Sequence, residues 1–289
     1  MFVHTFLIIF VIISFGGRAL KRDQKPRRWM RTILVLAVLA LLAVAALNKG
    51  LVVRHYEVVT AKAADVRFAL VSDLHAAWYG KGQVDLLKLI RDQQPDAILM
   101  AGDMIDNASS NESTLEFMKD AADIAPCFYV NGSHDLWSKQ HEECVRAIKG
   151  WGISVLDGDT ASLVVRGKRV TVSGIGDPTY GAFSDDRARY LGDLEVGFST
   201  LGPETFNVLI AHRPDYIPEY AKYPFDLVVS GHTHGGQVRI PLVVNGLFAP
   251  DQGWFPEYSG GLYTVGGTTM IISRGLSDYP NLPRVFNPP

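Results

Sequence analysis

Apolar runs that end on polar residues recur along the chain after residue 66. "VRFALVSD", "DAILMAGD" and "CFYV" predict three strands, and helical stretches separate them at about Gln83–Gln93, Glu112–Ile124 and, after the third strand, Lys139–Lys149. Val84, Leu87 and Ile90, for example, recur at the spacing of one helix face. This β-α-β-α-β order predicts parallel strands with helices on the faces of the sheet.

The second half of the chain is richer in strands and turns. "ASLVVRGKRVTVSGI" predicts a hairpin with Gly167 at its turn. Further strands are expected at "FNVLIAH", "DLVVSGH", "QVRI", "GLYTV" and "TMIISR". The fold class is therefore α/β.

Two apolar runs precede this region, "FVHTFLIIFVIISF" at Phe2–Phe15 and "ILVLAVLALLAVAAL" at Ile33–Leu47. Each needs flanking residues to reach the ~20 residues of a spanning helix. The first seventeen residues contain no Lys or Arg, unlike a signal peptide. We expect a transmembrane helical hairpin in residues 1–49 and a folded domain in residues 50–289. One span plus a surface-lying segment is the alternative.

The loop between these runs carries most of the local positive charge. Asp23 is its one acid against the basic residues Arg18, Lys21, Arg22, Lys25, Arg27, Arg28 and Arg31. Such loops stay in the cytoplasm, so both ends of the hairpin and the following domain should lie outside. Lys49 and Arg54 weaken this asymmetry. We expect a multi-pass cell-membrane protein with two spans, an extracytoplasmic domain, and membrane lipids as partners of the loop.

Charge and cysteine content exclude other classes of protein. The formal net charge of the 289 residues is -2, and no basic stripe of the kind that binds nucleic acid is present. Cys127 and Cys144 lack metal-ligand spacing and form no disulfide framework.

Polar residues collect where the predicted strands end. Asp73, Asp103, His134, His212 and His232 each follow such a strand. In open α/β sheets the carboxyl ends of strands form the ligand crevice. "GHTHGGQ" at residues 231–237 adds His234, and its glycines allow the backbone to approach a metal closely. The pattern predicts a metal site; solvated turn histidines are the alternative.

The sequence resembles the calcineurin-like metallophosphoesterases, within the membrane-anchored bacterial branch of the YkuE and YaeI type. The matching stretches are "SDLH", "PDAILMAGDMID", "GSHD", "LIAHRPD", "DLVVSGHTHGGQVRIP" and "SRGL...LPRVFNPP". The resemblance implies a four-layer α-β-β-α sandwich with two mixed β-sheets. It also implies two divalent metal ions.

The resemblance assigns a ligand role to six residues and to a seventh position, Ser133, beside the second ion. Asp73, His75 and His234 would hold the first ion, Asp103 would bridge both, and His212 and His232 would hold the second. The family has Asn where this chain has Ser133, whose hydroxyl is a poorer ligand. We therefore expect a weakened second site, since Asn131 lies ~6.6 Å further back along the strand.

The same resemblance suggests the chemistry. Carboxylate and imidazole ligands suit Mn, Fe, Zn or Ni, and Mn is favoured. Two ions about 3.5–4 Å apart share a hydroxide that attacks phosphorus. His134 would face the phosphate and protonate the leaving oxygen, with Asp135 orienting its ring.

The function expected from these residues is hydrolysis of a phosphodiester or pyrophosphate bond by a membrane-anchored enzyme. The substrate would be a phosphate ester or pyrophosphate, either lipid-linked or soluble. Some relatives in this branch cleave the pyrophosphate of UDP-2,3-diacylglucosamine, which lies on the cytoplasmic face, in conflict with the orientation above. The alternative is a catalytically weak metal-binding or scaffold protein, with its second metal site impaired by Ser133.

Overall fold

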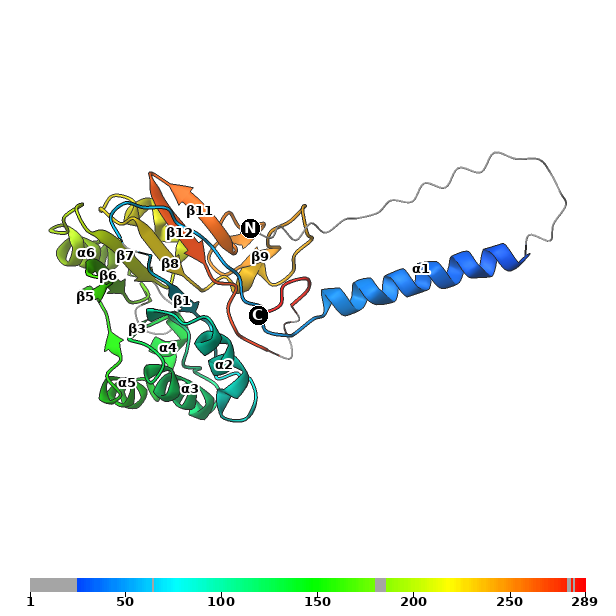
Figure 1. Cartoon of the computed structure of the whole chain (residues 1–289), viewed down its shortest axis with the longest axis horizontal. Helices are drawn as coiled ribbons and strands as arrows, with labels where there is room; N and C mark the ends of the chain where they lie inside the picture. Colours follow the sequence, from blue (N-terminus) through cyan, green and yellow to red (C-terminus); the bar gives the residue numbers. More distant parts are fainter. Residues whose placement is uncertain (1–24, 64, 180–185, 280–281, 283) are drawn as a thin grey trace. The chain divides into compact units, whose positions relative to one another are not determined.

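The computed structural model describes residues 25–289 except residues 64, 180–185, 280–281 and 283 (Figure 1). The chain divides into two compact units, one ending at Ala43 and the other running from Val44 to Pro289. The functional division predicted between residues 49 and 50 stays a prediction.

One helix of the described residues is long and apolar enough to cross a membrane. It is α1 (Lys25–Ala46), and its candidate span, Arg28–Ala46, is 19 residues long with 6 % of the tested window buried. The basic loop predicted up to Arg31 is therefore helical from Lys25 onward. The first apolar run, Phe2–Phe15, lies outside the described residues.

The first sheet is formed by the β-α-β-α-β region. Its order is β1 (Phe68–Val71), β2 (Ala97–Ala101), β3 (Cys127–Val130) and β4 (Ser154–Val155), and each described pairing is parallel. β2 is buried along its whole length, as expected of an apolar run inside a parallel sheet.

The second, larger sheet contains both parallel and antiparallel pairs. It is therefore mixed, as was expected of both sheets. It contains β5 (Asp159–Val165), β6 (Lys168–Ile175), β7 (Phe206–Ala211), β8 (Leu227–Ser230), β11 (Gly261–Val265) and β12 (Thr268–Ile272), in the order β11-β12-β8-β7-β6-β5. β5 and β6 are the predicted hairpin, turning at Gly167 with φ +79°. The strand predicted at "QVRI" is wrong, because those residues form only isolated bridges, such as Val238 with Val285.

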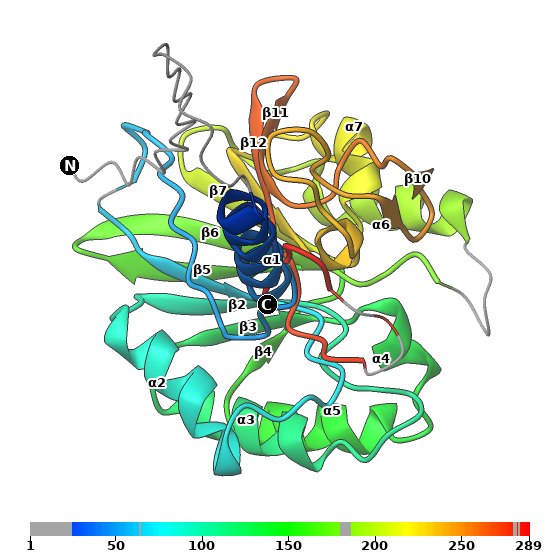
Figure 2. The same cartoon turned by 90° about the vertical axis from the view of Figure 1, so that its right-hand side faces the viewer.

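The two sheets pack face to face between two layers of helices (Figure 2). Leu99 and Val130 of the first sheet share an apolar core with Val172 and Val208 of the second. The outer face of the first sheet is covered by α2 (Val84–Asp92), α3 (Glu112–Ala122) and α5 (His141–Gly150). The outer face of the second is covered by α6 (Arg187–Phe198) and α7 (Ile217–Tyr220). The order of layers is α-β-β-α.

Three α-helices are absent from the sequence-based prediction. They are α6, α7 and α4 (Ser133–Trp137), and α4 starts directly after β3. A short antiparallel pair, β9 (Phe248–Ala249) and β10 (Gly253–Trp254), lies apart from both sheets. α4 and the β9–β10 pair each carry residues of the site described next.

Candidate metal centre

The candidate ligands come from the carboxyl ends of neighbouring strands. Asp73 follows β1, Asp103 follows β2, His212 follows β7 and His232 follows β8. Because these strands run parallel within their sheets, their ends lie at one edge of the sandwich. All four side chains are buried, which is unusual for charged or polar groups without a partner ion or hydrogen bonds.

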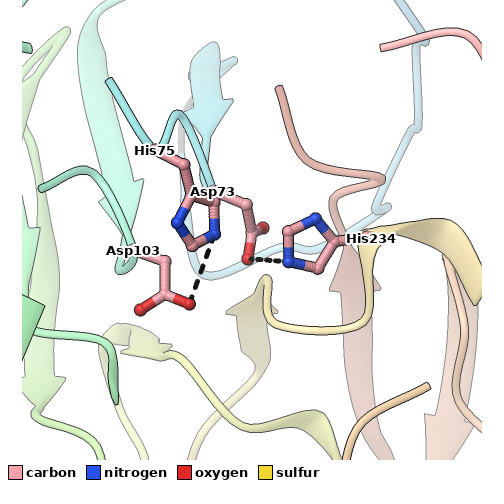
Figure 3. A group of neighbouring side chains, drawn as sticks. All are labelled: Asp73, His75, Asp103 and His234. Atoms are coloured by element: carbon pink, nitrogen blue, oxygen red, sulfur yellow. Dashed lines mark ion pairs between the residues drawn. The ribbon is translucent and has the colours of Figure 1, made fainter. Parts of the chain in front are cut away.

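A first group of four side chains converges at this edge. Ligand atoms of Asp73, His75, Asp103 and His234 all lie within 4.8 Å of one another (Figure 3). His75 Nε2 is 3.5 Å from Asp103 Oδ2, and His234 Nε2 is 3.8 Å from Asp73 Oδ1.

His75 shows that this group fits a cation. Both of its ring nitrogens are buried and neither has a hydrogen-bond partner. A buried polar atom without a partner costs about 1–3 kcal/mol. A metal ion coordinated by one of these nitrogens would remove that cost, and the mixed carboxylate and imidazole set suits a divalent transition metal.

A second group shares Asp103 with the first. It consists of Asp103, His212 and His232. His212 Nε2 is 3.2 Å from Asp103 Oδ2 and 3.2 Å from His232 Nδ1. The other nitrogen of His212, Nδ1, is 2.7 Å from the Ala101 carbonyl oxygen, to which it donates. Burial would lower the pKa of His212, but the Asp103 carboxylate outweighs it and raises the pKa to about 10, so Nε2 is protonated at neutral pH and a metal ion bound there would displace that proton.

The backbone at these ligands is strained. Asp73, His75, Asp103, His232 and His234 all have φ between 47° and 69°. Residues other than glycine rarely adopt this left-handed backbone conformation, and it persists only where surrounding contacts enforce it. One such contact is at Gly132, where a Cβ atom would lie 2.3 Å from Asp103 Oδ1.

Electrostatics favours the metal-binding forms of Asp103 and His234. Burial alone would raise the pKa of Asp103, but His212, with smaller contributions from His75 and His134, brings it well below its usual range. Burial lowers the pKa of His234 to about 3. Asp103 is thus ionised and His234 neutral, and both states leave lone pairs free for a cation.

His134 lies in the first turn of α4, beside Asp106, an acid that sequence reasoning missed. Its Nδ1 is 3.0 Å from Asn107 Oδ1 and 3.7 Å from Asp106 Oδ1. Burial works against protonation of His134, but Asp106 and Asp103 outweigh it and raise its pKa. Ligand atoms of His75, Asp106 and His134 also lie within 4.8 Å of one another, so these three side chains could hold a metal ion. Asp106 stands three residues after Asp103 in "GDMID", a spacing that offered a signal.

Asp135 has a different neighbourhood from the one predicted. Its carboxylate accepts hydrogen bonds from the backbone N–H groups of Asp103 at 2.7 Å, Ile105 at 2.6 Å and Gly132 at 2.6 Å. The described polar contacts of the His134 ring are with Asn107 and Asp106 and its ring contacts are with His75 and Trp137, so the predicted orienting contact with Asp135 is not among them. Asp135 instead fixes the loop that carries Asp103.

Comparison with known proteins decides the family. The family model for calcineurin-like phosphoesterases matches residues 66–236. The chain belongs to this family. The resemblance inferred from its motifs is confirmed, and so is the predicted class of enzyme, a hydrolase acting on ester bonds.

Individual relatives agree with this assignment. The chain is 27 % identical to the uncharacterized metallophosphoesterase YkuE of Bacillus subtilis over 65 % of this chain and 63 % of the relative. It is 28 % identical to the phosphodiesterase YaeI of Escherichia coli over 74 % of this chain and 76 % of the relative. A zebrafish (Danio rerio) transmembrane protein with a metallophosphoesterase domain is 25 % identical, over 96 % of this chain and 66 % of that protein.

A solved structure supports the fold alone. The sulfate thiohydrolase SoxB of Thermus thermophilus, in complex with glycerol, matches with a TM-score of 0.50 and 13 % identity, over 76 % of this chain and 53 % of that chain. The chain thus spans less than two thirds of SoxB and of YkuE. Family membership and the Asp/His groups together indicate divalent metal ions.

Ser133 stands at the position where the motif resemblance implies an asparagine. The residue is buried and lines a cavity of about 260 Å³ together with Asp103, His134 and His232. Asn131 does not take its place, because its Oδ1 is 3.0 Å from His141 Nε2. The described carboxylate and imidazole ligands of the second group are therefore only Asp103, His212 and His232.

An acid from the β9–β10 loop completes the surroundings of His232. His232 Nε2 is 2.7 Å from Asp251 Oδ2, and Arg213 pairs with the same oxygen. Arg213 Nε also donates to Asp177 Oδ2 at 2.9 Å. A carboxylate on the outer nitrogen fixes the tautomer and orientation of a ligating imidazole. Sequence reasoning missed Asp251, which no strand end or motif singles out.

Proposed function

We propose that this chain hydrolyses a phosphodiester or pyrophosphate bond with two divalent metal ions, manganese being favoured. The observation that carries the proposal is the sharing of Asp103 by two groups of potential ligands. One carboxylate that faces both groups is the arrangement expected of a two-metal site, in which the ions stabilise the attacking and leaving oxygens.

The ligand assignment follows the two groups. Asp73, His75 and His234 would hold the first ion, His212 and His232 the second, and Asp103 both. Ser133 would stand at the edge of the second site, as a weak or water-mediated ligand. When bound, the two ions would supply an activated water and positive charge for the phosphate oxygens.

The residues of the chain supply the remaining steps. Asn107 and Asp106 engage Nδ1 of His134, so Nε2 is the ring atom available to a substrate in the cavity. The raised pKa of His134 favours a protonated ring that gives its proton to the leaving oxygen. Asp135 acts indirectly, because its three backbone hydrogen bonds hold the Asp103 loop in place.

The apolar helix supports a proposal for the substrate and the location. Residues 1–49 would anchor the chain in the cell membrane by two spans, with the basic loop in the cytoplasm and residues 50–289 as an extracytoplasmic catalytic domain. The name of the zebrafish relative, a transmembrane protein, supports an anchor. An anchored site suits a lipid-linked phosphodiester or pyrophosphate. UDP-2,3-diacylglucosamine fits only if the domain faces the cytoplasm.

Ser133 favours a second candidate function, a catalytically weak metal-binding or scaffold protein. Without the asparagine of the family, the second ion has three described carboxylate and imidazole ligands. This candidate predicts metal binding without turnover.

Hydrolysis of bis(p-nitrophenyl) phosphate by the full chain in detergent tests the proposal. The chain is stripped with a chelator and reloaded with Mn²⁺. We expect turnover that requires the metal and that Asp103→Asn abolishes. Asp193→Asn is the matched control, because Asp193 is an exposed acid of α6 paired with Arg189. Metal binding with no turnover on diester or pyrophosphate substrates would favour the scaffold function.

A further inference from the structure

Large apolar side chains are exposed together between residues 240 and 255. Leu242 is 99 % exposed, Val243 76 % and Trp254 68 %. We use the term apolar surface for the six side chains Ile240, Leu242, Val243, Phe248, Trp254 and Phe255. Contiguous exposed apolar groups of this kind mark sites of interaction with proteins or membranes.

Backbone contacts make this surface continuous. The N–H of Leu247 donates to the Val238 carbonyl at 2.9 Å, and the N–H of Phe255 donates to the Leu247 carbonyl at 2.8 Å. The rings of Phe248 and Trp254 are 5.5 Å apart on the paired strands β9 and β10. The turn at residues 240–244 and the β9–β10 pair therefore form one patch.

The apolar surface lies next to the point where the candidate span enters the folded unit. Ala46, the last residue of that span, accepts a hydrogen bond from the N–H of Phe286 at 2.7 Å. The adjacent Val285 forms a parallel bridge with Val238 and accepts from the N–H of Arg239 at 2.9 Å. The exposed residues begin at Ile240, one position further on. A membrane anchor attached at Ala46 would thus be tethered close to this patch.

Three arginines beside the same point bind uncharged acceptors rather than carboxylates. Arg54 donates to the Pro288 carbonyl at 3.5 Å, Arg239 to the Asn245 carbonyl at 3.2 Å, and Arg274 to the Asn245 side chain at 3.0 Å. Arg274 is 8 % exposed, and its Nε has no hydrogen-bond partner. Burial, helped by Arg239 and Arg54, lowers the pKa of Arg274 to about 10. All three arginines are cationic, and Arg54 and Arg239 are more exposed than Arg274.

We infer that the apolar surface and these arginines dock the catalytic domain against the anionic lipid surface of the membrane that holds the anchor. The inference rests on the anchoring part of the proposed function and not on the hydrolysis. Trp and Phe at the rim of an apolar patch suit the headgroup level. Arginines near anionic headgroups add attraction that falls off within a Debye length.

Docking would also place the metal centre at the lipid surface. The hairpin of Trp254 carries Asp251, which holds His232, and Pro250 and Asp251 line the cavity of the site. A phosphate in a lipid headgroup could then reach the cavity without leaving the membrane surface. The docking surface thus favours a lipid-linked substrate over a soluble one.

An environment-sensitive fluorophore on the full chain tests the docking. The native thiols are buried, so Leu242→Cys can be labelled selectively, with Phe255→Cys as a second position. The matched control is Val196→Cys on α6, because Val196 is also apolar and 86 % exposed. The chain is reconstituted in phosphatidylcholine nanodiscs with or without phosphatidylglycerol, and brominated acyl chains serve as quenchers.

We expect blue-shifted emission and quenching by brominated lipid at positions 242 and 255 but not at 196, more strongly with phosphatidylglycerol. Arg54→Gln and Arg239→Gln should each lower the ratio of docked to free domain about 5-fold. Labels at 242 and 255 that report water, as at 196, would overturn the inference. An equal shift in lipid-free amphipol would overturn it too, by indicating a second copy of the chain. Flotation with lipid and diester hydrolysis, measured on the same samples, report the anchor and the enzyme separately.

Discussion

His212 and His232 face each other across the second ligand group, with Nε2 of His212 3.2 Å from Nδ1 of His232. The outer nitrogen of each ring is engaged: His212 Nδ1 with the Ala101 carbonyl and His232 Nε2 with Asp251. Burial would lower the pKa of His212, but the Asp103 carboxylate outweighs this effect and raises the pKa to about 10, so His212 Nε2 carries a proton within reach of both His232 Nδ1 and Asp103. A cation between these two nitrogens and Asp103 would take the place of that proton.

Asp251→Asn should weaken this second site selectively. An amide holds the outer nitrogen of His232 less well than a carboxylate, so the imidazole becomes a poorer ligand. Loss of such a supporting carboxylate lowers metal affinity about 10–100-fold. Calorimetric titration of the chelator-stripped chain with Mn²⁺ should show weaker binding at one site. Asp193→Asn is the control, and equal weakening at both sites would contradict the assignment of Asp251 to the second ion.

His134→Ala should reduce kcat and leave the metal content unchanged. Removal of a general acid costs about 10²–10⁴-fold in rate. Asp106→Asn should give a smaller loss, because it removes the charge that raises the pKa of His134. The loss should be smallest for a substrate with a good leaving group, such as p-nitrophenolate. If His134→Ala instead releases one ion, the group of His75, Asp106 and His134 holds metal and the general-acid role is wrong.

Ser133→Asn should strengthen the second site. The asparagine of the family has an amide oxygen on a longer side chain, and the position already lines the cavity beside His232. We expect tighter binding of the second Mn²⁺ and a modest increase in kcat. A large rise from near-zero activity would favour the scaffold function for the natural chain. Asn131→Ala is informative as well, because Asn131 contacts His141 and should leave metal affinity unaffected.

Gly132→Ala should destabilise the site through a steric clash. The added methyl would lie 2.4 Å from the backbone nitrogen of Asp103 as well as against its carboxylate. Forced contacts of this kind cost about 1–3 kcal/mol. Thermal unfolding should show a lowered Tm and a loss of metal affinity. Gly150→Ala, at the end of α5 with open space around its Cβ, should change the Tm little.

Sequence patterns were sufficient to predict the candidate ligands that directly follow strands. Asp73, Asp103, His212 and His232 each follow a buried apolar run, and parallel strands bring such positions to one edge. The structure brings these four residues together with His75 and His234 in the two ligand groups. Their roles as ligands stay predictions, since distance alone does not show coordination.

Asp251 and α4 belong to parts of the site that no hydrophobic pattern in the sequence predicts. Asp251 reaches His232 through the β9–β10 pair, whose two-residue strands are too short for a periodic pattern. α4 has five residues and is equally short for helical periodicity. "QVRI" alternates like a strand, but it lies outside both sheets, where tertiary contacts and not the pattern decide its conformation.

Metal stoichiometry of the full chain tests the account most directly. The chelator-stripped protein in detergent is titrated with Mn²⁺, and bound metal is counted by elemental analysis at saturation. We predict two equivalents per chain, the second bound more weakly because of Ser133, and loss of both sites' affinity in Asp103→Asn. A single equivalent at saturation, or an Asp103→Asn variant that binds metal like the natural chain, would contradict a centre built around one shared carboxylate.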